Sequence, residues 1–279
     1  MPINPELVGR TYPVSTYEVS AEAIRAYAAA TNEDNPAFAG DAPVAPPAFP
    51  VVPSSGVLAA VLFDPELGVN LARLVHGEED HILHAPIRPG DTLSVAGSLE
   101  STETKDSGET FTIYTSLTNA DGVLAAEVRS LMFVRGSGSR AKGAASEPQP
   151  EPEIAFSAVQ KVDEDQTYRY AEASGDHNPI HTDPEFAREA AGLPGIILHG
   201  MCTMAFAGKV ILDGACGSDP ARLRRIRVRF SKPVFPGETL TTRAWILGSG
   251  EGFTTYAFET LNTRESPVLR NGEAEVLDA

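Results

Sequence analysis

The sequence predicts an α+β protein built from an internal duplication. One segment occurs twice: Tyr27-Ala-Ala-Ala-Thr-Asn-Glu-Asp-Asn-Pro36 lies over Tyr170-Ala-Glu-Ala-Ser-Gly-Asp-His-Asn-Pro179. A second repeat follows each copy, Pro86-Ile-Arg-Pro-Gly-Asp-Thr-Leu93 in the first half and Pro233-Val-Phe-Pro-Gly-Glu-Thr-Leu240 in the second. Between the halves, residues 136–152 are rich in small and polar residues and proline and have no apolar period, which is typical of a linker. We therefore expect a first unit over residues 1–135, a linker over 136–152 and a second unit over 153–279.

Each half begins with signals for two helices, which predict helical segments over residues 20–30 and 54–63, then 165–173 and 201–212. Ser20 is a suitable N-cap for the first, and the Ser54-Ser55 pair could cap the second. The last segment is nearly all apolar without an internal proline, so we expect a buried helix that begins just after Gly200.

Alternating apolar and polar residues follow in both halves and predict strands over residues 92–99, 110–119 and 124–134, then 224–230, 239–247 and 254–262. Gly-containing turns separate them, as antiparallel neighbours require. Periodicity by itself thus predicts an α+β fold in two similar halves.

Composition excludes several classes of function. The 279 residues are 42% hydrophobic and 22% charged, which is normal for a globular protein with a sizeable core. The formal net charge of −16 repels nucleic acid and anionic membranes, so we expect neither as a partner. No apolar run approaches the ~20 residues that a membrane span needs, and no sorting signal is visible, so we expect a cytoplasmic protein. Cys202 and Cys216 are too few for a disulfide framework or a thiolate metal cage, and we expect small buried apolar residues.

Chemistry is concentrated in Gly175-Asp-His-Asn-Pro-Ile-His181, followed by Ile197-Leu-His-Gly-Met201. A carboxylate and an imidazole this close can share one water, which is the minimum apparatus for adding water to a double bond or removing it. The alternative from the residues alone is an ordinary turn, in which Asp176 bonds nearby backbone N–H groups and His181 starts a helix.

These two segments, at their spacing, closely resemble the signature of the MaoC-like, (R)-specific enoyl-CoA hydratase family, also called hydratase 2. The resemblance covers most of the chain and implies a double hotdog fold, in which each half wraps an antiparallel sheet around a long central helix. It also implies reversible hydration of trans-2-enoyl-CoA to (3R)-3-hydroxyacyl-CoA in fatty-acid metabolism, with coenzyme A as part of the substrate and no cofactor or metal.

The same resemblance assigns roles to individual residues. Asp176 and His181 hold the reacting water, and Asn178 orients the pair or the water by hydrogen bonding. The backbone N–H of Gly200, at a helix N-terminus, is placed to stabilise the negative charge that develops on the thioester oxygen. We expect His199 to support this site rather than transfer protons, and His177 to point to solvent.

The first half lacks the same chemistry. On the repeat, Asp176 corresponds to Glu33, Asn178 to Asn35 and His181 to Phe38. A phenyl ring transfers no proton, so we expect an inactive N-terminal site with Glu33 as a solvated acid. The freed half could then hold the acyl chain, with the apolar segment 42–53 lining its tunnel; the alternative is that its prolines form a rigid surface loop.

Two further clusters have open interpretations. His76, His81 and His84 lie among acidic residues and suggest a metal site, but such spacings arise by chance in acidic loops, and we favour a structural role.

The second cluster, Arg225, Arg227 and Arg229, occupies one face of a predicted strand, with Lys232 just after it. These cations, together with His199, are candidates for contact with substrate and with coenzyme A phosphates. The alternative for the arginines is a solvated face that pairs with neighbouring acids.

Two other functions compete with hydration. A hotdog thioesterase would release free coenzyme A, although the Gly-Asp-x-Asn-Pro-x-His run argues against hydrolysis. A non-catalytic acyl-thioester-binding subunit is disfavoured by the intact second motif. The sequence leaves open the chain length, the carrier (coenzyme A or acyl carrier protein), the direction of reaction and whether the protein is a monomer or a homodimer.

Overall fold

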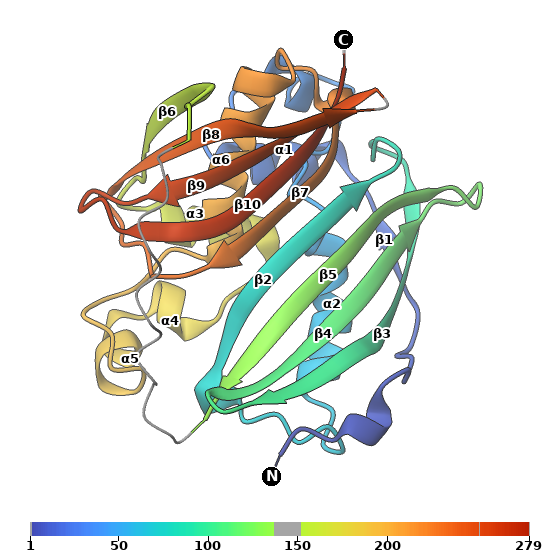
Figure 1. Ribbon diagram of the computed structural model, residues 1–279. Coiled ribbons are helices and arrows are strands. Elements are labelled where there is room, and N and C mark those ends of the chain that lie inside the picture. Colours follow the sequence, from blue (N-terminus) through green and yellow to red (C-terminus); the bar gives the residue numbers. More distant parts are fainter. Residues whose placement is uncertain (1, 137–151, 251, 279) are drawn as a thin grey trace.

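The computed structural model describes residues 2–136, 152–250 and 252–278, so residues 137–151 of the predicted linker lie outside the described residues (Figure 1). Its strands form one antiparallel ten-stranded sheet in the order β1-β3-β4-β5-β2-β7-β10-β9-β8-β6. The first half contributes β1 (Ser15–Glu18), β2 (Leu74–Leu83), β3 (Thr92–Lys105), β4 (Gly108–Thr118) and β5 (Leu124–Arg135). The second contributes β6 (Phe156–Lys161), β7 (Leu223–Phe230), β8 (Thr239–Gly250), β9 (Phe253–Leu261) and β10 (Pro267–Leu277).

Helices cover one face of this sheet (Figure 1). They are α1 (Ala21–Ala30) and α2 (Val51–Leu62) in the first half, then α3 (Gln166–Ser174), α4 (Pro179–Thr182), α5 (Pro184–Glu189) and α6 (Gly200–Ala215). Single 3₁₀ turns complete the list: η1 (Pro5–Leu7), η2 (Pro36–Phe38), η3 (Leu71–Arg73) and η4 (Pro220–Arg222).

Each half has one long helix packed against its own five strands, α2 against β3 and β4, and α6 against β6, β7, β8 and β10. Apolar side chains of both helices join one core with the inward-facing residues of the sheet. Burial of such apolar area is the main force that holds helix on sheet. The prediction of a double hotdog fold is confirmed.

The two halves meet along a seam made of backbone and aromatic contacts. Strand β2 pairs with β7, so that Glu79 lies opposite Val228 and His81 opposite Ile226. On the helical side, the equivalent residues Tyr27 and Tyr170 meet edge to face, with ring centroids 5.7 Å apart and hydroxyl oxygens 3.4 Å apart. The repeat seen in the sequence therefore places equivalent residues face to face.

Helix α2 differs from the prediction at its start. It begins at Val51 after Pro50, three residues before the expected Ser54, and no side chain caps it. Ser54 instead donates its hydroxyl back to the Pro50 carbonyl oxygen at 2.7 Å, inside the helix. The prolines at positions 50 and 53 misled the prediction, because proline is tolerated in a first helical turn where its missing N–H has no partner.

Several other expectations have a clear outcome. Ser20 caps α1 through the N–H of Ala23 as expected. The alternative of a surface loop over residues 42–53 is wrong, because residues 46–50 are buried throughout.

Both cysteines are buried, and burial raises the pKa of Cys216 to about 12, so its thiol stays protonated. Among the described residues, no helix is long and apolar enough to cross a membrane.

Candidate active site

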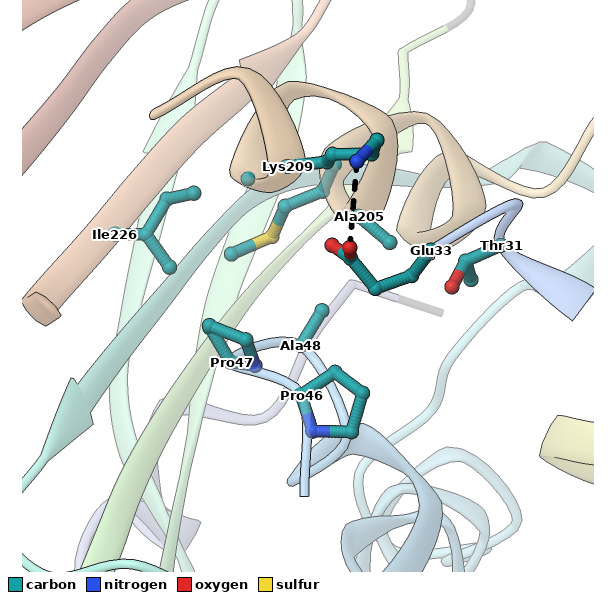
Figure 2. A pocket seen from close by; sticks show the side chains of 10 residues that line it. Thr31, Glu33, Pro46, Pro47, Ala48, Ala205, Lys209 and Ile226 are labelled. Atoms are coloured by element: carbon teal, nitrogen blue, oxygen red, sulfur yellow. Dashed lines mark ion pairs between the residues drawn. The ribbon is translucent and has the colours of Figure 1, made fainter. Parts of the chain in front are cut away.

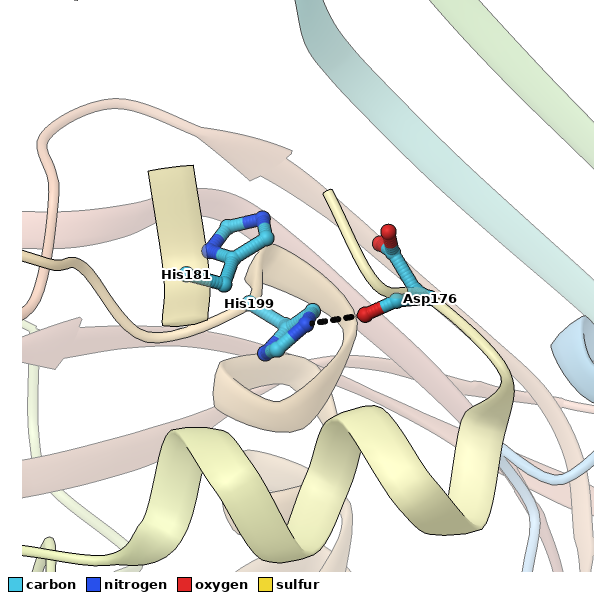
Figure 3. Close-up of side chains that lie close together, drawn as sticks. All are labelled: Asp176, His181 and His199. Atoms are coloured by element: carbon cyan, nitrogen blue, oxygen red, sulfur yellow. Dashed lines mark hydrogen bonds between the residues drawn. The ribbon is translucent and has the colours of Figure 1, made fainter. Parts of the chain in front are cut away.

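The predicted catalytic residues lie where the loop between α3 and α4 meets the first turn of α6 (Figure 3). Gly175 ends α3 with a φ of 76°, a left-handed conformation that glycine adopts without strain. The chain therefore turns sharply and presents Asp176 just beyond the helix. Sequence distance is bridged by this turn and by a backbone hydrogen bond from Ile197 to the Ile180 carbonyl.

Asp176 and Asn178 are arranged by side-chain to backbone hydrogen bonds. The Asp176 carboxylate accepts from the Asn178 N–H at 3.1 Å, and the Asn178 side-chain oxygen accepts from the Ile180 N–H at 3.2 Å. Asn178 thereby caps α4, a role that short polar side chains commonly take. The turn expected from the residues alone is present, and the Asp176 side chain remains exposed at the surface of the site.

His181 is buried with one ring nitrogen free. Its Nδ1 lies 2.7 Å from the Ile197 carbonyl oxygen, an acceptor, so Nδ1 carries the hydrogen and Nε2 keeps a lone pair. Burial lowers the pKa of His181, and the Ile197 carbonyl and the Asp176 carboxylate offset this only in part. A neutral imidazole whose Nε2 accepts hydrogen bonds is therefore the resting form near neutral pH.

His199 supports this arrangement from beneath. Its ring stacks on His181, with centroids 3.8 Å apart and planes at 26°, and its Nε2 donates to the Asp176 carbonyl oxygen at 2.9 Å (Figure 3). Burial and the neighbouring imidazole lower the pKa of His199 to about 4. His199 thus fixes both the backbone at Asp176 and the plane of the His181 ring. His177, by contrast, leaves 59% of its side chain exposed, as expected.

Asp176, His181 and His199 each place one ligand-type atom within 4.8 Å of the others, a spacing that could suit a metal ion. The hydrogen bonds oppose that use. The Nε2 of His199 carries the hydrogen that it donates to the Asp176 carbonyl, which leaves only its Nδ1, unpartnered among the described residues, as a ligand. Two stacked rings do not direct their lone pairs at one point. The group suits a water better than a cation.

Gly200 provides the free backbone N–H at the start of α6. It is the first residue of the helix, where an N–H has no intrahelical acceptor, and none occurs elsewhere among the described residues. A Cβ at this position would lie 3.1 Å from the Phe230 ring, so glycine also permits close packing there. This amide is preorganised for an anionic oxygen.

The equivalent loop of the first half keeps the turn but has different side chains. Glu33 accepts from the Asn35 N–H at 3.0 Å, as Asp176 does from Asn178, and Phe38 is 1% exposed. The expectation that Glu33 is solvated is wrong: 5% of its side chain is exposed, and it faces the ammonium of Lys209 at 3.5 Å (Figure 2). Burial raises the pKa of Glu33 although Lys209 opposes this. Lys209 comes from α6 of the other half, and no local pattern pairs it with Glu33.

The cationic strand is largely neutralised by acids. Arg225 contacts Asp80 at 2.7 Å and Glu275 at 3.2 Å, and Arg227 contacts Glu78 at 2.8 Å. These contacts support the alternative of a paired polar face for the first two arginines.

Arg229 and Lys232 are exposed, and no ion pair involves them in the described part of the chain. Arg270, which the sequence analysis did not single out, lies directly opposite Arg229 on β10. Two like charges in that position repel unless an anion or solvent screens them.

A cleft of about 380 Å³ adjoins the catalytic loop. Its walls come from β1, the first turns of α2 and the end of α3: Ser15–Tyr17, Val52, Pro53, Ser55, Gly56 and Ala173–Gly175. Val52 and Pro53 belong to the apolar segment expected to line an acyl tunnel. Short strand β1 was not predicted, so its share of the wall could not be foreseen.

Comparison with known proteins assigns the family. The MaoC-like domain family matches residues 145–266, and the FAS1-like dehydratase domain region matches residues 6–128. A 3-hydroxyacyl-thioester dehydratase Y of Mycobacterium tuberculosis is 34% identical over 238 residues, 81% of each chain. The chain belongs to the MaoC-like dehydratase family.

Other relatives agree with that membership. A peroxisomal enoyl-CoA hydratase 2 of Arabidopsis thaliana is 33% identical over 67% of this chain, which spans 62% of that protein. The crystal structure of a MaoC-like dehydratase from Phytophthora capsici has 31% identity and a TM-score of 0.78 over 96% of both chains. A Mycobacterium tuberculosis protein described as a double hotdog has a TM-score of 0.61 at 14% identity, which bears on the fold alone.

Within this MaoC-like chain, the comparisons divide as the repeat does. The segment that carries Asp176, His181 and Gly200 lies in the MaoC-like match, and Glu33 and Phe38 lie in the other. The two halves thus match two different families, in agreement with the different side chains of their loops.

Proposed function

We propose that this MaoC-like protein is a hydro-lyase that reversibly hydrates trans-2-enoyl-CoA to (3R)-3-hydroxyacyl-CoA, with one site per chain in the second half. The observation that carries the proposal is the spacing of Asp176 and His181, whose ligand-type atoms lie within 4.8 Å. One water that donates to two acceptors at ~2.8 Å each spans about 4.6 Å between them. The steric course is taken from the family.

The first step places and activates the water. Its two hydrogens point to the Asp176 carboxylate and to Nε2 of His181, which leaves an oxygen lone pair free to attack C3 of the enoyl chain. As the new C–O bond forms, the pair takes one proton from the water, and a proton is returned to C2. Reversing these transfers gives dehydration.

The second requirement is a group that stabilises the negative charge that develops on the thioester oxygen. During attack at C3, electrons move through the double bond onto the thioester oxygen, and the N–H of Gly200 is the donor available to that oxygen. The proposed reaction uses groups of the chain and the thioester itself, without a cofactor.

The cleft beside Gly175 is the proposed path of the acyl chain. Its volume of about 380 Å³ lies within the usual range of small-molecule sites, and Val52, Pro53 and Ala173 give it apolar walls. Gly56 lines it and would meet nothing within 4 Å if it carried a Cβ, so a larger side chain there would project without a clash.

For the phosphates of the carrier, we propose Arg229 and Lys232 rather than the ion-paired Arg225 and Arg227. Both are exposed, and Arg270 stands opposite Arg229 on the next strand. A neutralised double variant, Arg229→Gln with Lys232→Gln, should raise KM for enoyl-CoA and leave kcat nearly unchanged. The same substitutions at Arg264, in the turn between β9 and β10, and at Lys105, at the end of β3, are the matched control.

The decisive experiment mixes the purified protein with crotonyl-CoA and follows loss of the conjugated thioester absorbance. Asp176→Asn and His181→Ala should each lower kcat by roughly 10³-fold while the protein stays folded by circular dichroism. Retained activity in both variants would overturn the site assignment. A thiol-trapping reagent in the same cuvette detects free coenzyme A, which a thioesterase would release and a hydratase would not.

Chain length is tested on the same footing. Gly56→Leu should lower kcat/KM for dodecenoyl-CoA by about tenfold, because a difference of one methylene in an apolar pocket changes kcat/KM by roughly tenfold or more. The same variant should leave kcat/KM for crotonyl-CoA within twofold of wild type. Ala59→Leu, exposed on the same helix and outside the cleft, is the control. Equal effects of both variants would place the acyl chain elsewhere.

A single chain contains both halves of the paired fold, so we propose that the monomer is active and that any homodimer adds no catalytic residue.

A further inference from the structure

A fully buried carboxylate lies at the seam between the halves, outside the catalytic loop. Glu79 on β2 is 0% exposed, and its two oxygens contact two imidazoles: Oε2 lies 2.8 Å from Nε2 of His76, and Oε1 lies 2.9 Å from Nε2 of His81. For these histidines the sequence favours a structural role over a metal site. In the structure they are part of a strand, and their partner is a carboxylate.

A bulge at Gly77 brings the three side chains to one face. Side chains alternate along a regular strand, so His76 would point away from Glu79 and His81. The pairing of β2 with β5 shifts between His76 and Glu78, which adds one residue and turns His76 to the same face as Glu79. A Cβ on Gly77 would lie 2.9 Å from the Leu131 side chain, so the bulge depends on this glycine.

The hydrogen bonds of the cluster bear on the ionisation of Glu79 and on the donors of His81. Burial alone would raise the pKa of Glu79, but the two imidazoles lower it to about 2, so the carboxylate is ionised. His81 faces that carboxylate through Nε2 and the Pro47 carbonyl oxygen through Nδ1, the latter at 3.1 Å. Both partners accept hydrogen bonds, so the ring satisfies both contacts only where both of its nitrogens donate.

The cluster connects to the surroundings of the Gly200 amide and to the wall of the cleft. On one side the His76 ring packs on Phe230, with centroids 4.8 Å apart, and Phe230 is the ring that lies against Gly200. On the other side His81 holds Pro47, from which consecutive backbone turns lead directly into the start of α2. The residues at that start, Val52 and Pro53, form a wall of the cleft.

Stability alone does not explain such a group. A buried ion pair is often matched or exceeded in stability by apolar residues of the same volume, because desolvation of the charges is costly. What it does provide is geometry, since charged hydrogen bonds are short and directional.

We propose that Glu79 is a positioning residue that keeps the Gly200 amide and the acyl-chain cleft in fixed relation, acting through His76 on one side and His81 on the other. This role rests on the proposed hydratase function. It predicts that two contacts of the cluster affect different kinetic constants: the contacts that hold Glu79 against His76 act on the chemistry of every substrate, and the contact of His81 with Pro47 acts on binding of long chains.

Variants of Glu79 separate hydrogen bonding from charge. Glu79→Ala should lower kcat for crotonyl-CoA by about tenfold, because misplacement of the reacting geometry by even 1 Å is costly. Glu79→Gln should stay within threefold of wild type, since its amide can accept from His76 and donate to a neutral His81. Glu127→Ala removes the partner of the half-exposed His84, which lies just after β2, and is the control that should change neither constant.

A matched pair at His81 keeps the inference falsifiable if Glu79→Ala fails to fold. His81→Gln retains a donor toward Glu79 and loses the Pro47 contact, whereas His81→Asn retains the Pro47 contact and loses Glu79. The first should raise KM for dodecenoyl-CoA by about fivefold and leave crotonyl-CoA unchanged. The second should lower kcat for both substrates and leave the ratio of their KM values unchanged.

Equal fold-changes for short and long substrates in both His81 variants would overturn the positioning role, as would unchanged kinetics in folded Glu79→Ala. Turnover by wild type reports on the proposed function separately. If wild type showed no turnover, the same variants would be compared by calorimetric binding of butyryl-CoA and dodecanoyl-CoA. Loss of long-chain preference in His81→Gln alone would support the role, and identical binding by all proteins would refute it.

Discussion

The equivalent loops of the two halves, at Glu33–Phe38 and Asp176–His181, have the same backbone turn and different side chains. In both, an acid accepts from the N–H of an asparagine two residues later, and that asparagine caps the next turn. In the first half Phe38 follows, with buried prolines in place of a free amide at the helix start. In the second half His181 follows, and Gly200 offers its N–H. The same turn therefore forms with either set of side chains, and the proposed chemistry depends on the side chains that the turn presents.

The acids of the two loops also differ in their contacts. Lys209 enters the first loop from α6 and satisfies Glu33, so this acid is a structural ion pair. The second loop has no such cation among the described residues; His199 donates to its backbone and leaves the Asp176 carboxylate open. An acid that is to bind a reacting water must be accessible, and Asp176 is exposed whereas the Glu33 side chain is only 5% exposed.

The largest test exchanges the decisive residue between the loops. His181→Phe makes the second loop resemble the first, and kcat with crotonyl-CoA should fall by roughly 10³-fold, since no proton acceptor replaces the imidazole. Phe38→His, the reverse change, should leave turnover within twofold. If Phe38→His raised turnover, the first loop would retain catalytic capacity and the comparison would fail.

A second test concerns the free amide. Gly200→Pro removes the N–H where proline is tolerated at a first helical position, and kcat should fall by about 10²-fold. Gly200→Ala adds a Cβ near Phe230 but keeps the N–H, and is the matched control. A similar loss in both would attribute the effect to packing rather than to the missing donor.

A third test uses pH, because only the second loop contains stacked imidazoles. Burial lowers the pKa of both His181 and His199 in the folded protein, the latter to about 4. Their contribution to stability is therefore complete above the unfolded value of ~6.5 and is lost as pH falls toward 4, by about 2 kcal/mol. Urea unfolding from pH 7.5 to 4.5 measures it. A His181→Phe, His199→Phe double variant, which removes both imidazoles, should lose most of this slope. An unchanged slope would assign it to other groups.

The smallest expected effect is at the closed acid. Lys209→Met leaves Glu33 buried without its cation and should cost about 1 kcal/mol of unfolding free energy, with kcat within twofold. Adding Glu33→Gln should recover most of that loss, because a neutral amide needs no counter-charge. A large loss of activity in either variant would show that the first loop contributes to catalysis.

Much of the fold could be predicted from the sequence because it depends on local rules and on repetition. The cap at Ser20, the apolar run after Gly200 and the Asn-Pro turns each specify structure within a few residues, and the repeat extends them to both halves. Strands such as β10 were missed because polar residues and Gly272 interrupt their alternation, although they pair well in the sheet.

The site was predictable only where one motif carries it. Asp176, Asn178 and His181 lie within six residues, and spacing alone brings them together. The positions of Lys209 beside Glu33, Arg270 beside Arg229 and Glu79 between two histidines depend on strand register, a bulge and the packing of the halves. These are long-range outcomes that no local pattern encodes.

Because β2 and β7 belong to one chain, the two sides of the seam that they form can be substituted independently. In a symmetric dimer of identical subunits, a single substitution appears on both sides of the interface, so a lysine that blocks one loop would block both. Here the seam unites two independently mutable copies, and each position can change alone. The continuity of the chain is thus what permits an asymmetric molecule: one loop can be closed by packing while the equivalent loop keeps an exposed carboxylate.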